Sequence, residues 1–319
     1  MNNKIILSLF LFLVLLLAGT CFLFSLDTYY KTVFYPKLTF EATLNDDKYK
    51  TTLGFGNLDS PEKLGIESKT IQFESFDGTN LSGWFIPSQN NTSNRCIIIC
   101  HDRFSNRLEG MKFLDALNNA GMLNSYHVFL PDLRNSGVSE DAETYMGYKF
   151  AEDIVTSATV VQKQFGVDNF VFFGIGMGAT AAAIAMKRAD MIKHLQSMEI
   201  HIEGLILDSP ISNAETLIIR QNKDIFYPFV ATSLFLFNKD VEGYLENIRL
   251  SFLLKKTDFP VLILQNIGDE ITPTDILLAE LQEIPDIQLE LFDGVEHAGM
   301  ILHPGYKNRY IELIKTFLN

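Results

Sequence analysis

A short segment near the middle of the chain constrains the fold most, because an apolar run ends in three alternating glycines and an alanine-rich stretch follows. Val171–Phe173 predicts the end of a buried strand, and Ala179–Arg188 predicts a helix. Gly174, Gly176 and Gly178 lie between them. Glycine tolerates tight turns and close backbone approach. The sequence therefore predicts a strand joined directly to a helix by a sharp turn.

This turn has the spacing of the nucleophile elbow Gly-x-Ser-x-Gly, in which a serine hydroxyl is lifted above the end of a sheet. Gly176 stands at the nucleophile position, so this chain has no side chain there that could attack a substrate. The elbow backbone is strained for a residue with a side chain, at a cost of about 1–3 kcal/mol, whereas glycine adopts it freely. We therefore expect Gly176→Ser to lower the thermal stability.

Short apolar runs alternate with longer amphipathic stretches from Lys69 to the end of the chain. An alternating pattern that turns at Asp77-Gly78 predicts a hairpin up to Ile86. The later strands and helices alternate, which is typical of a mostly parallel sheet with helices on both faces. The predicted strands are Cys96–Cys100, His127–Pro131, Phe170–Phe173, Gly204–Leu207, Val261–Gln265 and Ile287–Phe292, and the helices include Leu108–Ala120, Glu152–Phe165, Asp275–Gln282 and Tyr306–Phe317. We predict one α/β domain over residues 66–319.

Residues 210–258 interrupt this alternation, because they contain no clear strand. Their apolar stretches are too short to cross a membrane, since Lys223-Asp224 and Lys239-Asp240 divide them. Two interpretations remain open. The segment is a cap insertion over the active-site cleft with an apolar underside, or it is a set of helices that completes the core.

The first 26 residues predict a transmembrane signal anchor. Ile5–Leu26 is uncharged and spans 22 residues, about 33 Å as a helix, which is enough for the hydrocarbon core of a bilayer. A cleaved signal peptide and a lipoprotein, suggested by Ala18–Cys21, are the alternatives. We expect residues 27–65 to form a tether, and the soluble domain to be extracytoplasmic. Lys4 on one side against Lys31 and Lys37 on the other determines the orientation only weakly.

Further motifs follow predicted strands in the order nucleophile, acid, histidine. Ile97–Arg103 reads as a strand followed by an oxyanion loop, and Pro131–Ser139 as an Asp-x-Arg-x-x-Gly-x-Ser loop. Asp269 lies after one later strand and His297 after the last. In a serine hydrolase, histidine takes the proton of the nucleophile and a carboxylate orients that histidine.

With these motifs the chain resembles the α/β-hydrolase superfamily, in particular the membrane-anchored bacterial branch related to serine aminopeptidases and lysophospholipase-like esterases. The resemblance covers about residues 66–319. It implies Asp269 as the triad acid and His297 as the general base. It also implies that the backbone N–H groups of Arg103 and Met177 form the oxyanion hole.

The chain departs from this pattern at two positions. Gly176 replaces the nucleophile, and Asp102 replaces the glycine that usually follows His101, which adds negative charge where an oxyanion would form. We therefore predict a catalytically impaired pseudoenzyme that binds a small acyl or peptide-like ligand, or a protein partner, in the retained cleft. Two alternatives remain. The protein is an active hydrolase of esters or amides that uses the His297–Asp269 pair with water or an unrecognised nucleophile, or it is a scaffold at the membrane.

Composition excludes other classes of partner. The net charge is −13, which argues against a nucleic-acid partner because phosphate binding needs clustered Lys and Arg. Cys96 and Cys100 are four residues apart on one predicted strand, roughly 13 Å, which is too far for a disulfide. Cysteine and histidine show no zinc spacing, so we expect neither a metal nor another cofactor.

Overall fold

An eight-stranded sheet in the order β10-β9-β8-β7-β4-β5-β3-β2 forms the centre of the computed structural model, which describes residues 3–90, 93–284 and 287–319. All neighbouring strands are parallel except β3, which is antiparallel to both β2 and β5. The strands of this sheet are β2 (Lys69–Glu74), β3 (Asn80–Ile86), β4 (Arg95–Cys100), β5 (His127–Asp132), β7 (Asn169–Ile175), β8 (His201–Asp208), β9 (Val261–Asn266) and β10 (Gln288–Phe292). The predicted hairpin and the mostly parallel sheet are confirmed.

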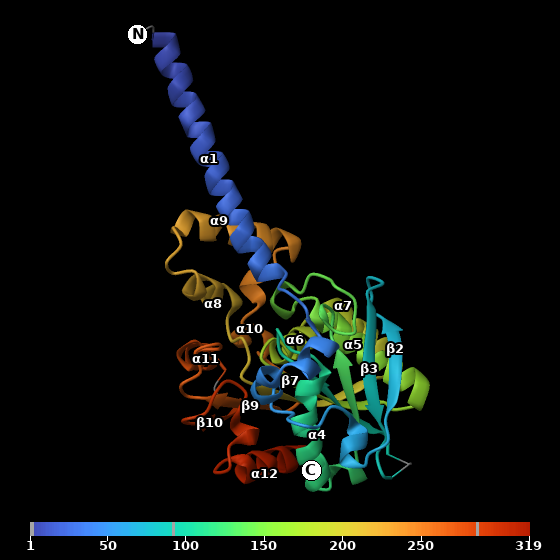
Figure 1. Cartoon of the computed structure of the whole chain (residues 1–319). Helices are drawn as coiled ribbons and strands as arrows, with labels where there is room; N and C mark the ends of the chain where they lie inside the picture. Colours follow the sequence, from blue (N-terminus) through green and yellow to red (C-terminus); the bar gives the residue numbers. More distant parts are fainter. Residues whose placement is uncertain (1–2, 91–92, 285–286) are drawn as a thin grey trace.

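Helices connect the strands and cover both faces of the sheet (Figure 1). The α-helices are α1 (Asn3–Val33), α2 (Phe40–Asn45), α3 (Asp47–Thr52), α4 (Gly110–Asn119), α5 (Phe150–Phe165), α6 (Met177–Ala185), α7 (Ala189–Ser197), α8 (Ala214–Gln221), α9 (Tyr227–Asp240), α10 (Leu250–Leu253), α11 (Thr274–Leu281) and α12 (Lys307–Leu318). The 3-10 helices are η1 (Pro61–Leu64), η2 (Arg107–Glu109), η3 (Met122–Asn124), η4 (Tyr145–Gly147), η5 (Leu245–Asn247) and η6 (Met300–Leu302). Helix α7 was not predicted from the sequence. Helix α6 ends at Ala185, three residues before the predicted end at Arg188.

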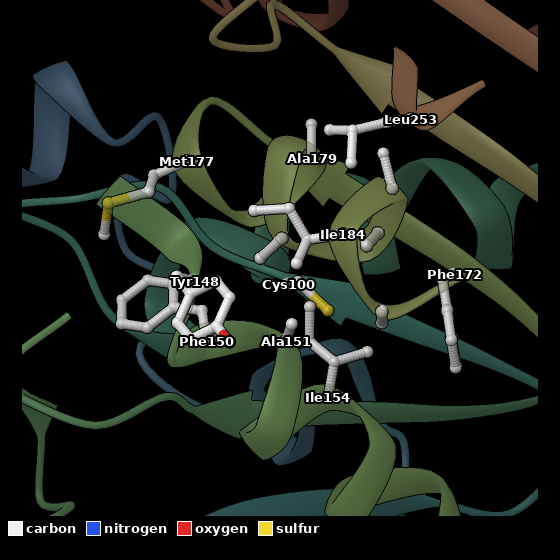
Figure 2. Packing of buried hydrophobic residues seen from close by; sticks show 14 of the residues in the cluster. Cys100, Tyr148, Phe150, Ala151, Ile154, Phe172, Met177, Ala179, Ile184 and Leu253 are labelled. Atoms are coloured by element: carbon white, nitrogen blue, oxygen red, sulfur yellow. The ribbon is translucent and has the colours of Figure 1, made fainter. Parts of the chain in front are cut away.

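The two faces of the sheet bury two separate hydrophobic clusters. Strand β4 illustrates this, because Cys96, Ile98 and Cys100 lie in one cluster while Ile97 and Ile99 lie in the other. Such alternation follows from the two-residue period of a strand that is covered on both faces. Figure 2 shows the first cluster, in which Cys100 lies among side chains of α5 and α6. Both cysteines of β4 are free, as expected from their spacing.

Helix α1 projects away from the domain at its N-terminal end (Figure 1). Among the described residues it is the one helix that is long and apolar enough to cross a membrane, with a mean hydropathy of 2.8 in a window of which none is buried. The first two residues of the predicted anchor lie outside the described residues. The helix does not end near Leu26 but continues to Val33, and Ser25, Thr28, Tyr29 and Val33 are buried against other parts of the chain.

The segment over residues 27–65, which we expected to form a tether, is folded against the domain. It contains the end of α1, then β1 (Leu38–Thr39), α2, α3 and η1, and β1 pairs in parallel with β6 (Ser136–Gly137). Tyr35, Leu53 and Phe55 are buried. Apolar side chains spaced along this segment therefore hold it on the domain, since burying them removes apolar surface from water.

The segment over residues 210–258 is helical and contains α8, α9, η5 and α10. Side chains from all four elements, including Leu217, Phe237 and Leu250, belong to the same hydrophobic cluster as α5 and α6. Helix α9 also packs on α1. The segment thus contributes side chains to the core, and a cap insertion over the cleft stays a prediction.

Candidate active site

The predicted sharp turn lies between β7 and α6. Gly176 has φ 52° and ψ −116°, and Met177 begins the helix. The Gly176 N–H donates to the backbone oxygen of Asp208 at 2.8 Å, which ties the turn to the neighbouring strand. A side chain at Gly178 would collide with the backbone of Cys100. Glycine at these positions therefore lets the helix start directly against the end of the sheet.

Asp102 occupies the space in which a nucleophile side chain would lie. A Cβ atom built on Gly176 would overlap the carboxyl group of Asp102. Oδ1 of Asp102 accepts a hydrogen bond from the Met177 N–H at 2.6 Å, and Oδ2 lies 3.2 Å from Nε2 of His297. The two departures noted in the sequence are therefore one structural feature, because the missing side chain at 176 makes room for the carboxylate from 102.

A buried network holds the loop that carries Asp102. Its N–H donates to Oε2 of Glu109 at 3.1 Å, and the hydroxyl of Ser105 donates to the same oxygen at 2.8 Å. His101 accepts the Leu133 N–H on Nε2, so its proton is on Nδ1, which donates to the backbone oxygen of Asp102 at 2.7 Å. His101 therefore positions the loop and takes no direct part in the site.

The predicted acid and histidine are brought together as expected. Oδ2 of Asp269 lies 2.7 Å from Nδ1 of His297. Oδ1 of Asp269 accepts hydrogen bonds from the N–H groups of Ile271 and Thr272, both at 2.9 Å, and the Thr272 hydroxyl donates to Oδ2 at 3.0 Å. The turn after β9 thus saturates the carboxylate and fixes its orientation, which in turn orients the imidazole.

His297 lies between two carboxylates, one on each ring nitrogen. Burial alone would lower its pKa, but the hydrogen bonds and charges of Asp102 and Asp269 outweigh burial and raise the pKa to about 10. At neutral pH the ring is therefore an imidazolium that donates from both nitrogens. A protonated imidazole cannot accept a proton from a nucleophile.

Both carboxylates are held ionised. Burial favours the protonated form of Asp102, but His297 and the backbone N–H groups of Met177 and Arg103 outweigh it, so the Asp102 pKa lies below its ordinary value. The pKa of Asp269 is lowered in the same way, against burial, by His297 and Thr272. The two N–H groups predicted for the oxyanion hole therefore already serve an anion that belongs to the chain itself.

A third carboxyl group, that of Asp208, differs from these two because its pKa is raised and not lowered. Burial raises the pKa of Asp208 to about 6, although Tyr310 donates to it at 2.6 Å and Ser209 at 2.9 Å. Ser209 itself has φ 52°, and its hydroxyl accepts the Ala298 N–H at 3.4 Å. In the sequence, Asp208-Ser209-Pro210 indicates the end of a strand that shapes the floor of the cleft, but it does not indicate the hydrogen bond from Tyr310.

The site offers no converging metal ligands. Asp102 and Asp269 face opposite nitrogens of one imidazole, so their oxygens do not point to a common centre. Throughout residues 3–90, 93–284 and 287–319, no group of three or more His, Cys, Asp or Glu side chains could hold a metal ion.

Comparisons with known proteins identify the fold. No protein-family model matches the chain, and no curated protein sequence matches it. Solved structures do. An esterase from Pyrococcus furiosus has a TM-score of 0.62 and 20% identity, over 82% of this chain and 96% of that one. The esterase RhEst1 from a Rhodococcus species has a TM-score of 0.52 and 17% identity, over 78% and 98%.

A third similar structure is larger than this chain. Acylaminoacyl peptidase from Pyrococcus horikoshii has a TM-score of 0.57 and 15% identity, and the match covers 78% of this chain but 42% of the peptidase. The three matches each cover 78% to 82% of this chain. This chain therefore has the α/β-hydrolase fold.

Proposed function

We propose that this protein is a membrane-anchored pseudoenzyme of the serine-hydrolase type, in which its own carboxylate occupies the reaction centre. The observation that carries the proposal is the position of Asp102, with one oxygen on the Met177 N–H and the other on His297. Serine-type acyl transfer needs a hydroxyl, a neutral base and free oxyanion donors. Here Gly176 has no hydroxyl, His297 is protonated, and the Met177 N–H is engaged.

The proposed role is binding of a small acyl or peptide-like ligand, or of a protein partner, without turnover. The side chains of Asp102 and His297 are still 13% and 12% exposed, so their edges are open to contact. A neutral amide or hydroxyl group suits this site better than an anion, because the anion position is filled and the three charged groups carry a net charge of −1.

The membrane anchor is part of the same proposal. We take α1 as uncleaved because it runs as one continuous helix from the apolar residues to Ser25, Thr28, Tyr29 and Val33, which are buried on the domain. We also propose that the soluble domain lies on the extracytoplasmic side of the membrane. Protease digestion of intact and of disrupted cells tests this placement.

A fluorophosphonate probe, which reacts with activated serines, tests the loss of catalysis. We expect no labelling of the natural chain. Gly176→Ser alone is also expected to stay unlabelled, because the new side chain collides with Asp102. Gly176→Ser combined with Asp102→Gly opens the oxyanion hole and lowers the pKa of His297, so this double variant should be labelled.

Two results would contradict the proposal. Labelling of the natural chain would reveal a nucleophile elsewhere. Failure of the folded double variant to react would mean that the remaining groups are not arranged for serine chemistry. Addition of His297→Ala to the double variant is the matched control, and it should abolish the labelling.

One observation favours a second candidate function, in which Asp102 is itself the nucleophile. Its carboxylate is ionised, and the Met177 N–H supports one of its oxygens. Oδ2 would form a bond to a saturated carbon while a halide leaves, which gives an ester of Asp102. The ester carries no charge, so the pKa of His297 falls, the imidazolium releases one proton to solvent, and the neutral ring can then take a proton from the attacking water. Attack of that water on the ester carbonyl then releases the alcohol.

Mass spectrometry distinguishes this second function from the first. We would incubate the natural chain with 1-bromohexane in ¹⁸O-labelled water, because hydrolysis of the ester leaves one labelled oxygen in Asp102. The variant His297→Gln should retain the ester, and His297→Gln with Asp102→Asn is its control. No label and no adduct in the folded proteins would exclude the carboxylate as a nucleophile.

A further inference from the structure

We propose that the N-terminal half of α9, with the residues just before it, docks into the surface of the lipid bilayer beside α1. The docking surface consists of Ile225, Phe226 and Tyr227. This inference concerns an interaction surface away from the active site. It rests on the part of the proposed function that places α1 in a membrane.

Helix α9 is fixed to α1 at the end of the apolar run, so its level relative to the bilayer follows from α1. The ring of Phe24, within Ile5–Leu26, stacks on Phe229 with centroids 5.7 Å apart and planes at 6°. The Ser233 hydroxyl donates to the backbone oxygen of Ser25 at 2.7 Å. Figure 1 shows α9 lying across the base of α1. The start of α9 therefore lies where α1 leaves the hydrocarbon region.

The other end of α9 is farther from the bilayer. The Tyr29 hydroxyl donates to the Asp240 carboxylate, five residues along α1 from Phe24 and away from its apolar part. Because Phe229 and Asp240 meet α1 at these two levels, α9 is inclined, with its N-terminal end toward the apolar run. The charged end of α9 thus lies on the water side.

The N-terminal end exposes aromatic side chains that α1 does not cover. Phe226 and Tyr227 are 67% and 60% exposed. Large aromatic side chains are enriched at the boundary between headgroups and hydrocarbon, where an apolar ring and a polar edge are both satisfied. A contiguous exposed apolar patch on a folded protein marks an interaction site, and the bilayer is the surface that α1 brings next to this one.

The charges near the patch indicate that docking is apolar. Lys223 and Asp224 precede it and Lys239 and Asp240 end the helix, so each pair is neutral overall. Docking into uncharged phosphatidylcholine is therefore expected without anionic lipid.

Quenching of tryptophan fluorescence by brominated lipid tests the proposal in the full chain, reconstituted in phosphatidylcholine vesicles. The natural Trp84 is buried and gives the same background in every variant. Three variants are compared. Phe226→Trp lies in the docking surface, Phe76→Trp is a matched control at an exposed phenylalanine of the β2–β3 turn, and Leu15→Trp lies in α1.

We expect strong quenching for Leu15→Trp by lipids brominated deep in the acyl chain. For Phe226→Trp we expect quenching by lipids brominated near the headgroup, and for Phe76→Trp none above the Trp84 background. Quenching of Leu15→Trp without quenching of Phe226→Trp overturns the docking surface and leaves the anchor intact. Absence of quenching in both overturns the docking surface together with the anchor.

Discussion

The two sides of the His297 ring differ in what they retain of a serine hydrolase. On the Nδ1 side, Asp269 and its turn form the acid–histidine pair of such an enzyme, with the carboxylate saturated by Ile271 and Thr272. On the Nε2 side, a second carboxylate stands where a serine hydroxyl would be. The same imidazole is oriented by the first partner and charged by both.

This difference teaches that an intact acid–histidine pair does not by itself indicate a working base. The pKa of a histidine beside one carboxylate and a neutral hydroxyl lies near the range needed for proton transfer. A second carboxylate in place of the hydroxyl moves it to about 10. The partner at Nε2 therefore determines whether the imidazole oriented by Asp269 is neutral or charged at neutral pH.

Removal of the imidazole should have the largest effect. His297→Ala leaves Asp102 and Asp269 buried without their shared cation, which should cost about 3–5 kcal/mol in free energy of unfolding. Urea denaturation at pH 7 measures the loss. His201→Ala, at an exposed histidine at the start of β8, is the control and should change the stability little. Equal stability of the two variants would show that the ring does not bind the two carboxylates together.

A side chain introduced at Gly176 tests the interaction on the Nε2 side of His297, because it competes with Asp102 for the same space. Gly176→Ser should destabilise the protein by about 1–3 kcal/mol through overpacking against Asp102, and the positive φ of 52° adds strain in the same direction. The accompanying change Asp102→Gly should recover the overpacking part. A double-mutant cycle followed by thermal unfolding measures this coupling. Additive effects of the two substitutions would contradict a shared space.

The pH dependence of stability sharpens the comparison further, because it changes the charge of His297 without any substitution. The pKa of His297 is raised from 6.5 to about 10 in the folded state, so its contribution is complete below pH 6.5 and is lost as the pH rises through about 10. The lowered pKa values of Asp102 and Asp269 act oppositely, and their contribution is lost as the pH falls below about 4. Unfolding free energies of the natural chain and His297→Ala should converge between pH 7 and pH 10.5.

Asp102→Asn provides the control for this pH series. It keeps the shape of the side chain but removes one of the two charges on His297, so the alkaline loss of stability should begin at a lower pH. An unchanged alkaline midpoint would mean that Asp269 alone sets the pKa of the ring. Asp269→Asn, measured beside it, separates the two contributions.

The backbone elements that carry the site were predicted well from the sequence, because they depend on local patterns. Apolar runs and glycine spacing located β7, the elbow and α6, and the chain order placed Asp269 beside His297. It interpreted Asp102 as an extra charge next to the oxyanion site. That the carboxylate enters the volume vacated by Gly176 depends on packing between residues far apart in the chain, which no local pattern encodes.

The same limit applies to the N-terminal segment. Its composition is mixed, so it reads as a tether, yet Tyr35 and Phe55 are buried on the domain. Whether such side chains are buried depends on the shape and polarity of the domain surface that they contact, which the local sequence does not specify. Helix α7 was missed for a related reason, because α6 and α7 are separated by only three residues, Met186–Arg188, and form one helical pattern in sequence.

The overlap between a Cβ atom at position 176 and the Asp102 carboxyl group also bears on the order in which substitutions at these two positions can occur. A chain with any side chain at 176 has no room for the Asp102 carboxylate in its present place. In a lineage that began with a serine at the elbow, loss of that serine therefore came before, or together with, the arrival of aspartate at 102. Return is obstructed in the same way, since serine at 176 is admitted only after aspartate has left. Aspartate at 102 therefore obstructs a later return of a side chain at 176 for as long as the carboxylate keeps its present place.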